Sequence, residues 1–146
     1  MELAEIHEVV ASRLRGDDQR YTVKRRALVE VLQRSGRPLS MPSILEQSPG
    51  MAQSSVYRNL AVLEHAAVVR RIVTNDDHAA FELSEDLSSH HHHLICSSCG
   101  VIEDFVVPED LEKQLSTVLT GAAQRHQFAA STHILDLFGT CKDCAA

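Results

Sequence analysis

Apolar residues recur every three or four positions along the N-terminal half of the chain. This spacing, which lets one face of a helix pack on a core, runs through residues 2–15, 23–34, 42–47 and 53–66. Thr22 and Ser40 stand at the expected N-cap positions of the second and third segments, and Gly36 and Pro49 follow the ends of these segments. The pattern therefore predicts four helices.

Two β-like runs follow the helices, at residues 68–74 and 78–83. The three residues between them, Asn75-Asp76-Asp77, are typical of a hairpin turn. Helices followed by a two-stranded hairpin are the outline of a winged helix-turn-helix. We expect this domain to span residues 1–83.

The rest of the chain indicates a smaller α/β domain. It contains β-like runs at 91–96 and 101–107, a predicted helix over 108–125 and a predicted last strand over 128–138. One face of that helix is apolar and carries Leu111, Leu115, Val118 and Leu119. The polar segment 84–89 is predicted to be a hinge, so the second domain covers 90–146 and the fold class is α+β. Because a domain of about 60 residues buries little core, we expect a metal ion or a partner subunit to stabilise it.

The charge distribution changes what the composition implies. The 146 residues carry 14 Lys and Arg against 20 Asp and Glu, a net charge of −6 that by itself argues against nucleic acid. However, residues 1–83 hold 11 basic and 11 acidic side chains, so the negative charge lies in the second half. Residues 19–37 form a basic segment with six Lys and Arg against Glu30 alone. This segment indicates a DNA-binding face, with a solvated helix face as the alternative.

Membrane and secreted classes of protein are not expected. The chain has no run of about 18 apolar residues, which a membrane-spanning helix requires. Its first ten residues lack a basic stretch followed by an apolar core, so no secretory signal is visible.

The four cysteines form two Cys-x-x-Cys pairs, Cys96 with Cys99 and Cys141 with Cys144. Two such pairs suit a tetrahedral Zn²⁺, because each short turn presents two sulfurs to one centre. Two disulfides are the alternative, but they require an oxidising compartment. A zinc ion held by four sulfurs has no open coordination position, which indicates a structural site.

Four consecutive histidines, 90–93, precede the first cysteine. In an extended chain, side chains alternate between faces, so His90 and His92 point one way and His91 and His93 the other. The run can then supply two separate metal sites, with a solvated polar turn as the alternative. Imidazole binds Zn²⁺, Fe²⁺, Ni²⁺ and Cu²⁺, so ligand type leaves the metal open.

Other residues are candidates to complete these sites. They are Glu82, His78, Asp104, Glu112 and His133. His7 and His65 lie in predicted helices far from this group along the chain, and we expect them at the surface.

In combination, these motifs resemble the ferric uptake regulator (Fur) family of bacterial metal-responsive repressors. The resemblance extends from about Arg20 to Cys144. It rests on Thr22-x-x-Arg25, Ser55-Val56-Tyr57-Arg58-x-Leu60, Phe81-Glu82-Leu83, His90-His91-His92-His93-Leu94-Ile95-Cys96-x-x-Cys99-Gly100 and His133-x7-Cys141-x-x-Cys144. It implies a cytoplasmic homodimer with an N-terminal winged helix-turn-helix and a small C-terminal α/β dimerisation domain, which is not an enzyme.

Carried over residue by residue, the resemblance implies three metal sites. The structural zinc falls on Cys96, Cys99, Cys141 and Cys144. A regulatory site falls on Glu82, His91, His93 and Asp104. A second site in the dimerisation domain falls on His90, His92, Glu112 and His133. The regulatory metal is expected to be Zn²⁺ or Fe²⁺, with Mn²⁺ and Ni²⁺ as further candidates.

The segment 53–66 is the expected recognition helix, because the N-terminal part of such a helix meets base edges in the major groove. Its candidate DNA contacts are Gln53, Ser54, Ser55, Tyr57 and Arg58. Tyr57 suits a thymine methyl and Arg58 a phosphate or guanine, with a core aromatic as the alternative for Tyr57. Arg20, Lys24 and Arg25 match the basic residues with which the family contacts the DNA backbone or minor groove.

The expected function is metal-dependent repression, in which metal at an interdomain site closes the dimer onto a palindromic operator in double-stranded DNA. One alternative is a peroxide-sensing repressor that uses iron, because Asp104 stands where peroxide-sensing members of the family have Asp and iron-type members usually have Glu. A metal-storage or chaperone protein is another alternative, from a different class. A zinc hydrolase is disfavoured, because half the chain forms a winged helix and little remains for a substrate pocket.

Overall fold

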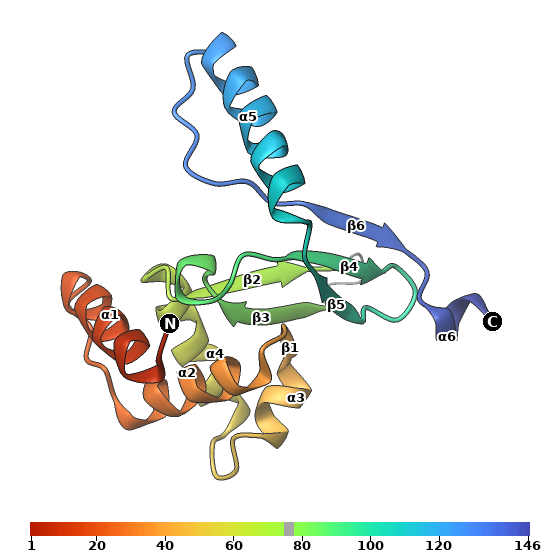
Figure 1. Cartoon of the computed structure of the whole chain (residues 1–146). Helices are drawn as coiled ribbons and strands as arrows, with labels where there is room; N and C mark the ends of the chain where they lie inside the picture. Colours follow the sequence, from red (N-terminus) through yellow and green to blue (C-terminus); the bar gives the residue numbers. More distant parts are fainter. Residues whose placement is uncertain (75–77) are drawn as a thin grey trace. The chain divides into compact units, whose positions relative to one another are not determined.

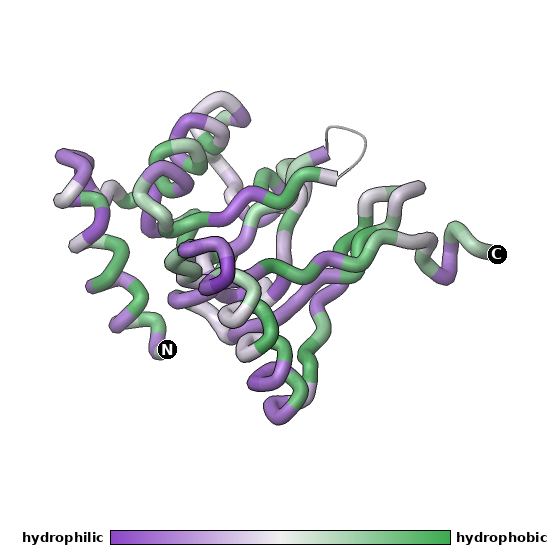
Figure 2. Tube along the Cα trace, turned by 90° about the horizontal axis from the view of Figure 1, so that it is seen from above, coloured by the Kyte–Doolittle hydropathy of each residue, from purple (hydrophilic) through white to green (hydrophobic). Residues whose placement is uncertain are grey.

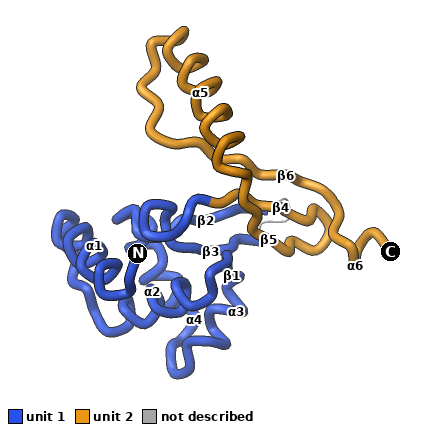
Figure 3. Tube along the Cα trace, viewed as in Figure 1, with its two compact units in different colours: residues 1–90 blue, residues 91–146 orange. Residues whose placement is uncertain are grey.

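The computed structural model describes residues 1–74 and 78–146, so the predicted turn at 75–77 lies outside the described residues. The chain divides into two compact units, Met1–His90 and His91–Ala146 (Figures 1 and 3). Among the described residues, no helix is both long enough and apolar enough to cross a membrane.

The first unit contains the four predicted helices. They are α1 (Leu3–Gly16), α2 (Val23–Ser35), α3 (Met41–Glu46) and α4 (Gln53–His65). The predicted caps are confirmed: the Thr22 hydroxyl accepts a hydrogen bond from the Arg25 N–H, and the Ser40 hydroxyl accepts one from Ser43. Gly36 ends α2 at φ 60°, a left-handed conformation that favours glycine. The apolar faces of the helices meet in one core, to which Val10, Leu28, Val56 and Leu63 contribute.

The sheet of the first unit completes a winged helix. It consists of β1 (Leu39–Ser40), β2 (Val69–Val73) and β3 (Ala79–Leu83) in the order β1-β3-β2, with both pairings antiparallel. The hairpin of β2 and β3 was predicted. The two-residue strand β1 was not, because a segment this short shows no periodicity.

The predicted hinge at 84–89 is an ordered turn in this structure. Residues Glu85–Leu87 form a short 3-10 helix, η1, and Leu87 is only 2% exposed within the core of the first unit. Arg13 of α1 also hydrogen-bonds the Ser84 hydroxyl and pairs with Asp86. The two units divide at His90 and His91, after this turn, because the buried leucine holds the segment on the winged helix.

The second unit is a three-stranded sheet with two helices. Its elements are β4 (His92–Cys96), β5 (Ile102–Phe105), α5 (Glu109–Arg125), β6 (Asp136–Gly139) and α6 (Lys142–Ala145). The strand order is β5-β4-β6, in which β4 pairs antiparallel with β5 and parallel with β6. The prediction of a strand over 128–138 was wrong in extent, because pairing with the short β4 begins only where Asp136 meets His93.

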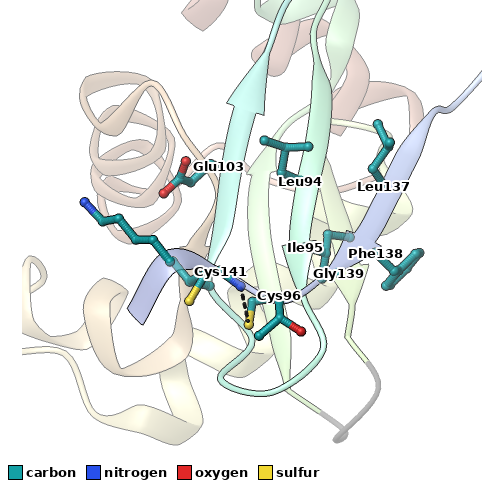
Figure 4. A pocket seen from close by; sticks show the side chains of 11 residues that line it. Leu94, Ile95, Cys96, Glu103, Leu137, Phe138, Gly139 and Cys141 are labelled. Atoms are coloured by element: carbon teal, nitrogen blue, oxygen red, sulfur yellow. Dashed lines mark hydrogen bonds between the residues drawn. The ribbon is translucent and has the colours of Figure 1, made fainter. Parts of the chain in front are cut away.

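The apolar face predicted for α5 is not buried within the chain. Every residue of α5 is described and none is buried, with Val118 66% exposed. Leu94, Leu137 and Phe138 of the sheet are also exposed and line a groove of about 480 Å³ (Figure 4). Figure 2 colours the trace by the hydropathy of each residue. Contiguous exposed apolar surface of this kind marks an interaction site, so the second unit presents a face for a partner.

Candidate metal centres

The four cysteines gather at one end of the second unit. Cys96 ends β4, and Cys99 lies in the turn that follows. Cys141 is the N-cap of α6, and Cys144 lies within this helix. Their sulfurs all lie within 4.8 Å of one another, and Cys99 Sγ is 3.8 Å from Cys141 Sγ. Zn–S bonds of about 2.3 Å in a tetrahedron place sulfurs about 3.8 Å apart. The donor set and its spacing therefore fit one Zn²⁺.

The thiols of the cysteine cluster differ in acidity. All four cysteines are free thiols. The pKa of Cys96 is lowered to about 6, because the backbone N–H groups of Cys141 and Cys99 donate to its sulfur (Figure 4). Side-chain hydrogen bonds with Cys141 and Cys99 raise the pKa of Cys144 to about 12. The Cys96 thiolate forms readily, while hydrogen bonding and burial raise the pKa values of Cys99 and Cys144, so a bound cation is needed to ionise the set.

A second cluster forms around Glu112, on the first turns of α5. Glu112 Oε2 is 3.0 Å from His92 Nε2, and Glu112 Oε1 is 2.8 Å from His133 Nε2. The two imidazole rings are 5.6 Å apart, and His92 is only 1% exposed. The ligand atoms of these three residues lie within 4.8 Å of one another, and two imidazoles with one carboxylate suit a transition metal.

A third cluster contains the other two histidines of the run. His91 Nε2 and His93 Nε2 each lie 3.8 Å from an oxygen of Asp104 on β5. The two rings are 5.1 Å apart and nearly perpendicular, and His93 is 1% exposed. His92 lies beside Glu112, whereas His91 and His93 lie beside Asp104. Strand alternation predicts this division of the run between two clusters.

The remaining candidate ligands lie in the first unit. Glu82 is buried in β3 opposite Arg70, with 3.7 Å between Arg70 Nη1 and Glu82 Oε1. His90 ends this unit and forms an ion pair with Glu85. His78 is exposed at the start of β3. The part of Glu82, His90 and His78 in metal binding stays a prediction.

His65 is exposed as predicted, but the same prediction for His7 was wrong. The side chain of His7 is 11% exposed; its Nδ1 lies 2.7 Å from the Tyr21 hydroxyl and its Nε2 3.3 Å from Glu30 Oε1. Burial and the charge of Arg26 lower its pKa, against the opposite effect of Glu30. Helical periodicity did not reveal this histidine because its partners come from the neighbouring helix and the turn before it.

The predicted DNA contacts lie on α4 and at the start of α2. Gln53, Ser54 and Arg58 are exposed, Ser55 is half-buried, and Tyr57 is 49% exposed, which excludes the core alternative for this aromatic. Arg20 and Lys24 are exposed as well. Such a surface, with polar and aromatic side chains on one helix and cations on another, is typical of a helix-turn-helix that reads DNA.

Arg25 is joined to α4. Its Nε donates to Asn59 Oδ1 at 3.1 Å, and its Nη1 donates to the Arg20 carbonyl at 2.6 Å. Asn59 in turn donates to the Ser55 carbonyl at 2.8 Å. Arg25 therefore fixes α2 against α4 in addition to adding charge. Local periodicity carries no signal of this contact, since it joins residues 34 positions apart.

Comparisons with known proteins decide the family. A sequence profile of the ferric uptake regulator family matches residues 17–138. The chain belongs to the ferric uptake regulator family. It is 34% identical over 102 residues to the ferric uptake regulation protein of Legionella pneumophila, covering 70% of each chain. It is 31% identical over 131 residues to the peroxide operon regulator of Bacillus subtilis, covering 86% of this chain and 84% of that protein.

A solved structure agrees. The ferric uptake regulator of Helicobacter pylori, described as having three functional metal binding sites, matches with a TM-score of 0.74 and 28% identity. That match covers 100% of this chain and 95% of the other. The chain is thus a metal-responsive regulator of the Fur family, whose members are transcription regulators that bind DNA and act as dimers.

Proposed function

We propose that this regulator is a metal-dependent repressor whose DNA affinity is set at Glu82, His91, His93 and Asp104. One observation supports this most: two imidazoles and a carboxylate converge within 4.8 Å on the sheet of the second unit. Ligands held on strands lose little conformational freedom when they bind a cation, so this part of the site is preorganised.

Glu82 is the proposed fourth ligand, from the winged-helix unit. The motif Phe81-Glu82-Leu83 supports this assignment, since it matches the family's motif at the end of the hairpin. A bound divalent cation supplies positive charge that offsets the two carboxylates and joins the ligands. With Glu82 among those ligands, the orientation of α4 is tied to that of the second unit. The metal favours the DNA-binding arrangement of the two units only if the four ligands bind it more tightly in that arrangement than in others. The difference between these metal-binding free energies sets the size of the effect.

The other two clusters have different proposed roles. Cys96, Cys99, Cys141 and Cys144 hold a structural Zn²⁺, supported by their four-sulfur donor set. His92, Glu112 and His133, with His90 as a fourth ligand, form a second metal site in the dimerisation unit. We propose that the apolar face of this unit pairs two copies in the cytoplasm, and that the two α4 helices then meet successive half-sites of a palindrome.

The test is a metal titration that follows DNA binding. An operator is first selected from random duplex DNA with metal-loaded protein, and binding is then measured by fluorescence anisotropy. We expect metal to raise the DNA affinity of the wild type and to have little effect on His91→Ala and His93→Ala. His126→Ala, which removes an exposed histidine after α5, is the matched control and responds like the wild type. A normal metal response in His91→Ala and His93→Ala contradicts the assignment.

Peroxide sensing is a second candidate function at the same site. Asp104, where iron-type relatives usually carry Glu, and the match to the peroxide operon regulator favour it. Incubation with Fe²⁺ and hydrogen peroxide then adds one oxygen atom to His91 or another ligand, detected by mass spectrometry of peptides. An unchanged mass together with a retained, reversible metal response removes this candidate.

A further inference from the structure

We infer that Asp136, outside the ligand sets above, is a positioning residue that fixes His93 for the regulatory metal. This inference rests on the proposed function, because it concerns the same site. Asp136 Oδ1 lies 2.9 Å from His93 Nδ1, while His93 Nε2 lies 3.8 Å from Asp104. Each ring nitrogen of His93 therefore has a different carboxylate beside it.

The sheet register produces this arrangement. His93 of β4 lies directly opposite Asp104 of β5 and directly opposite Asp136 of β6. Residues opposite each other in a sheet project on the same face. The three side chains therefore form one row, Asp104–His93–Asp136, and the central ring lies between two carboxylates.

The contact selects one form of the imidazole. A carboxylate only accepts hydrogen bonds, so His93 Nδ1 carries the proton and donates it to Asp136. In the neutral ring the lone pair is then on Nε2, the nitrogen beside Asp104 and His91. Carboxylate partners on the far nitrogen of a ligating histidine orient the ring and raise its basicity, and their removal weakens metal binding about 10–100-fold.

Burial makes the contact stronger. The side chain of His93 is 1% exposed and that of Asp136 is 22% exposed, so water competes weakly for this hydrogen bond. A buried imidazole without a partner on Nδ1 would lose this hydrogen bond and rotate or change tautomer more easily. The carboxylate thus holds His93 ready before a cation arrives.

Co²⁺ binding tests the inference in variants that share one background. The background carries His133→Ala, to remove the second dimerisation-domain site, and has its cysteine cluster loaded with Zn²⁺ so that Co²⁺ reports the regulatory site. Asp136→Asn keeps an acceptor oxygen, whereas Asp136→Leu keeps the approximate size and removes the acceptor. Both variants lose the same charge, so the difference between them reports the hydrogen bond.

We expect Asp136→Leu to weaken Co²⁺ binding about 10–100-fold and Asp136→Asn to weaken it less. The absorption spectrum of the saturated protein stays that of the parent, because the ligands are unchanged. Asp110→Asn, an exposed carboxylate on α5, is the control for charge and binds Co²⁺ like the parent. Thermal unfolding of each apo protein checks that the sheet has folded.

Two results overturn the inference. Asp136→Leu that folds and binds Co²⁺ as tightly as the parent shows that the contact does no positioning. A saturated spectrum that changes in both variants shows that Asp136 is itself a ligand. His91→Ala in the same background separates the two proposals: if it takes up Co²⁺ normally, the proposed regulatory site is wrong and the inference fails with it. If only His91→Ala loses binding, the inference alone is wrong.

Discussion

Exposed cations at the start of α2 are the predicted phosphate contacts. Lys24 lies in the first turn of α2, and its side chain is exposed. Phosphate contacts position a protein on DNA but carry no sequence information. Lys24 therefore differs in its expected role from Tyr57, which lies on the recognition helix.

Lys24→Ala tests this role. Losing one phosphate contact should weaken binding to all DNA sequences alike and lower the slope of log affinity against log salt by about 1. The slope is measured by anisotropy over a salt series with metal saturated. Lys113→Ala, which removes an exposed cation paired with Glu109 on α5, should leave the slope unchanged. A change of sequence preference in Lys24→Ala would instead assign it to base reading.

Single residues also show what the sequence alone could predict. Ligand types and spacing predicted one site for the four cysteines and two alternating pairs within the histidine run, because chemistry and strand alternation are local properties. Asp136 was missed as a partner of His93, since their contact depends on the register of β6 against β4. Local periodicity does not predict the register between two strands whose paired residues, His93 and Asp136, lie 43 positions apart.

The contact between α1, α2 and the turn that joins them includes a histidine whose ionisation depends on folding. Burial and Arg26 lower the pKa of His7, while burial raises the pKa of Tyr21 to about 12, so its hydroxyl keeps its proton and donates to His7 Nδ1. The unfolded chain then binds a proton at His7 at a higher pH than the folded chain does. The free energy of unfolding is therefore highest above the ordinary pKa of histidine and falls as pH drops through that range.

His7→Gln measures this contribution. Between about pH 7.5 and about pH 5.5, the wild type should lose more free energy of unfolding than the variant does. Urea unfolding of the metal-free protein at both pH values gives the two differences. Because other histidines titrate in both proteins, only the difference between them reports His7. An identical loss in both would show that His7 has no lowered pKa.

β6 and the second cysteine pair form one continuous segment. β6 ends at Gly139, and Cys141 follows two residues later with its N–H on Cys96 Sγ. This contact holds β6 beside β4, where the register sets Asp136 against His93. We therefore expect the cysteine cluster to affect the cluster of His91, His93 and Asp104 through one short strand.

Cys141→Ser tests this connection. We expect a lower midpoint of thermal unfolding and loss of bound zinc, because the structural metal contributes directly to folding. We also expect weaker metal binding at His91, His93 and Asp104. Thr140→Ala, at the neighbouring position, should retain both properties. Retained metal affinity at these residues in a zinc-free Cys141→Ser protein would show that the two clusters are independent.

Elements differed in how well local pattern predicted them. The four N-terminal helices and the hairpin followed from periodicity and caps, since their apolar faces meet within the first unit. The extent of β6 did not follow, because its apolar neighbours at 128–135 have no partner strand within the described chain. The segment 84–89 was predicted to be a hinge from its polar composition, and its one buried residue, Leu87, packs in the core of the first unit.

The whole molecule is expected to function as a pair of chains. α5 and the sheet of the second unit expose apolar side chains that no described part of the chain covers, and family members act as dimers. A unit of this size gains much of its stability from such an interface. We therefore expect this exposed surface to form the interface between the two chains.

Charged substitutions on this face test the interface. Val118→Glu and Leu137→Glu, at positions 66% and 48% exposed, should shift the protein to monomer and weaken operator binding. Sedimentation velocity gives the mass, and circular dichroism checks folding. Val23→Glu, at an 84% exposed position in the first unit, adds the same charge and should leave the mass unchanged. Folded variants with the wild-type dimer mass would place the interface elsewhere.

The central claim is that one metal site and the DNA-reading surface are energetically coupled. Coupling is reciprocal, so DNA must tighten metal binding by the factor by which metal tightens DNA binding. The most direct test measures metal affinity with and without saturating operator DNA, for the wild type and Glu82→Gln. We predict equal factors in both directions for the wild type and a factor near one for Glu82→Gln. A wild-type metal affinity that operator DNA leaves unchanged would contradict the account.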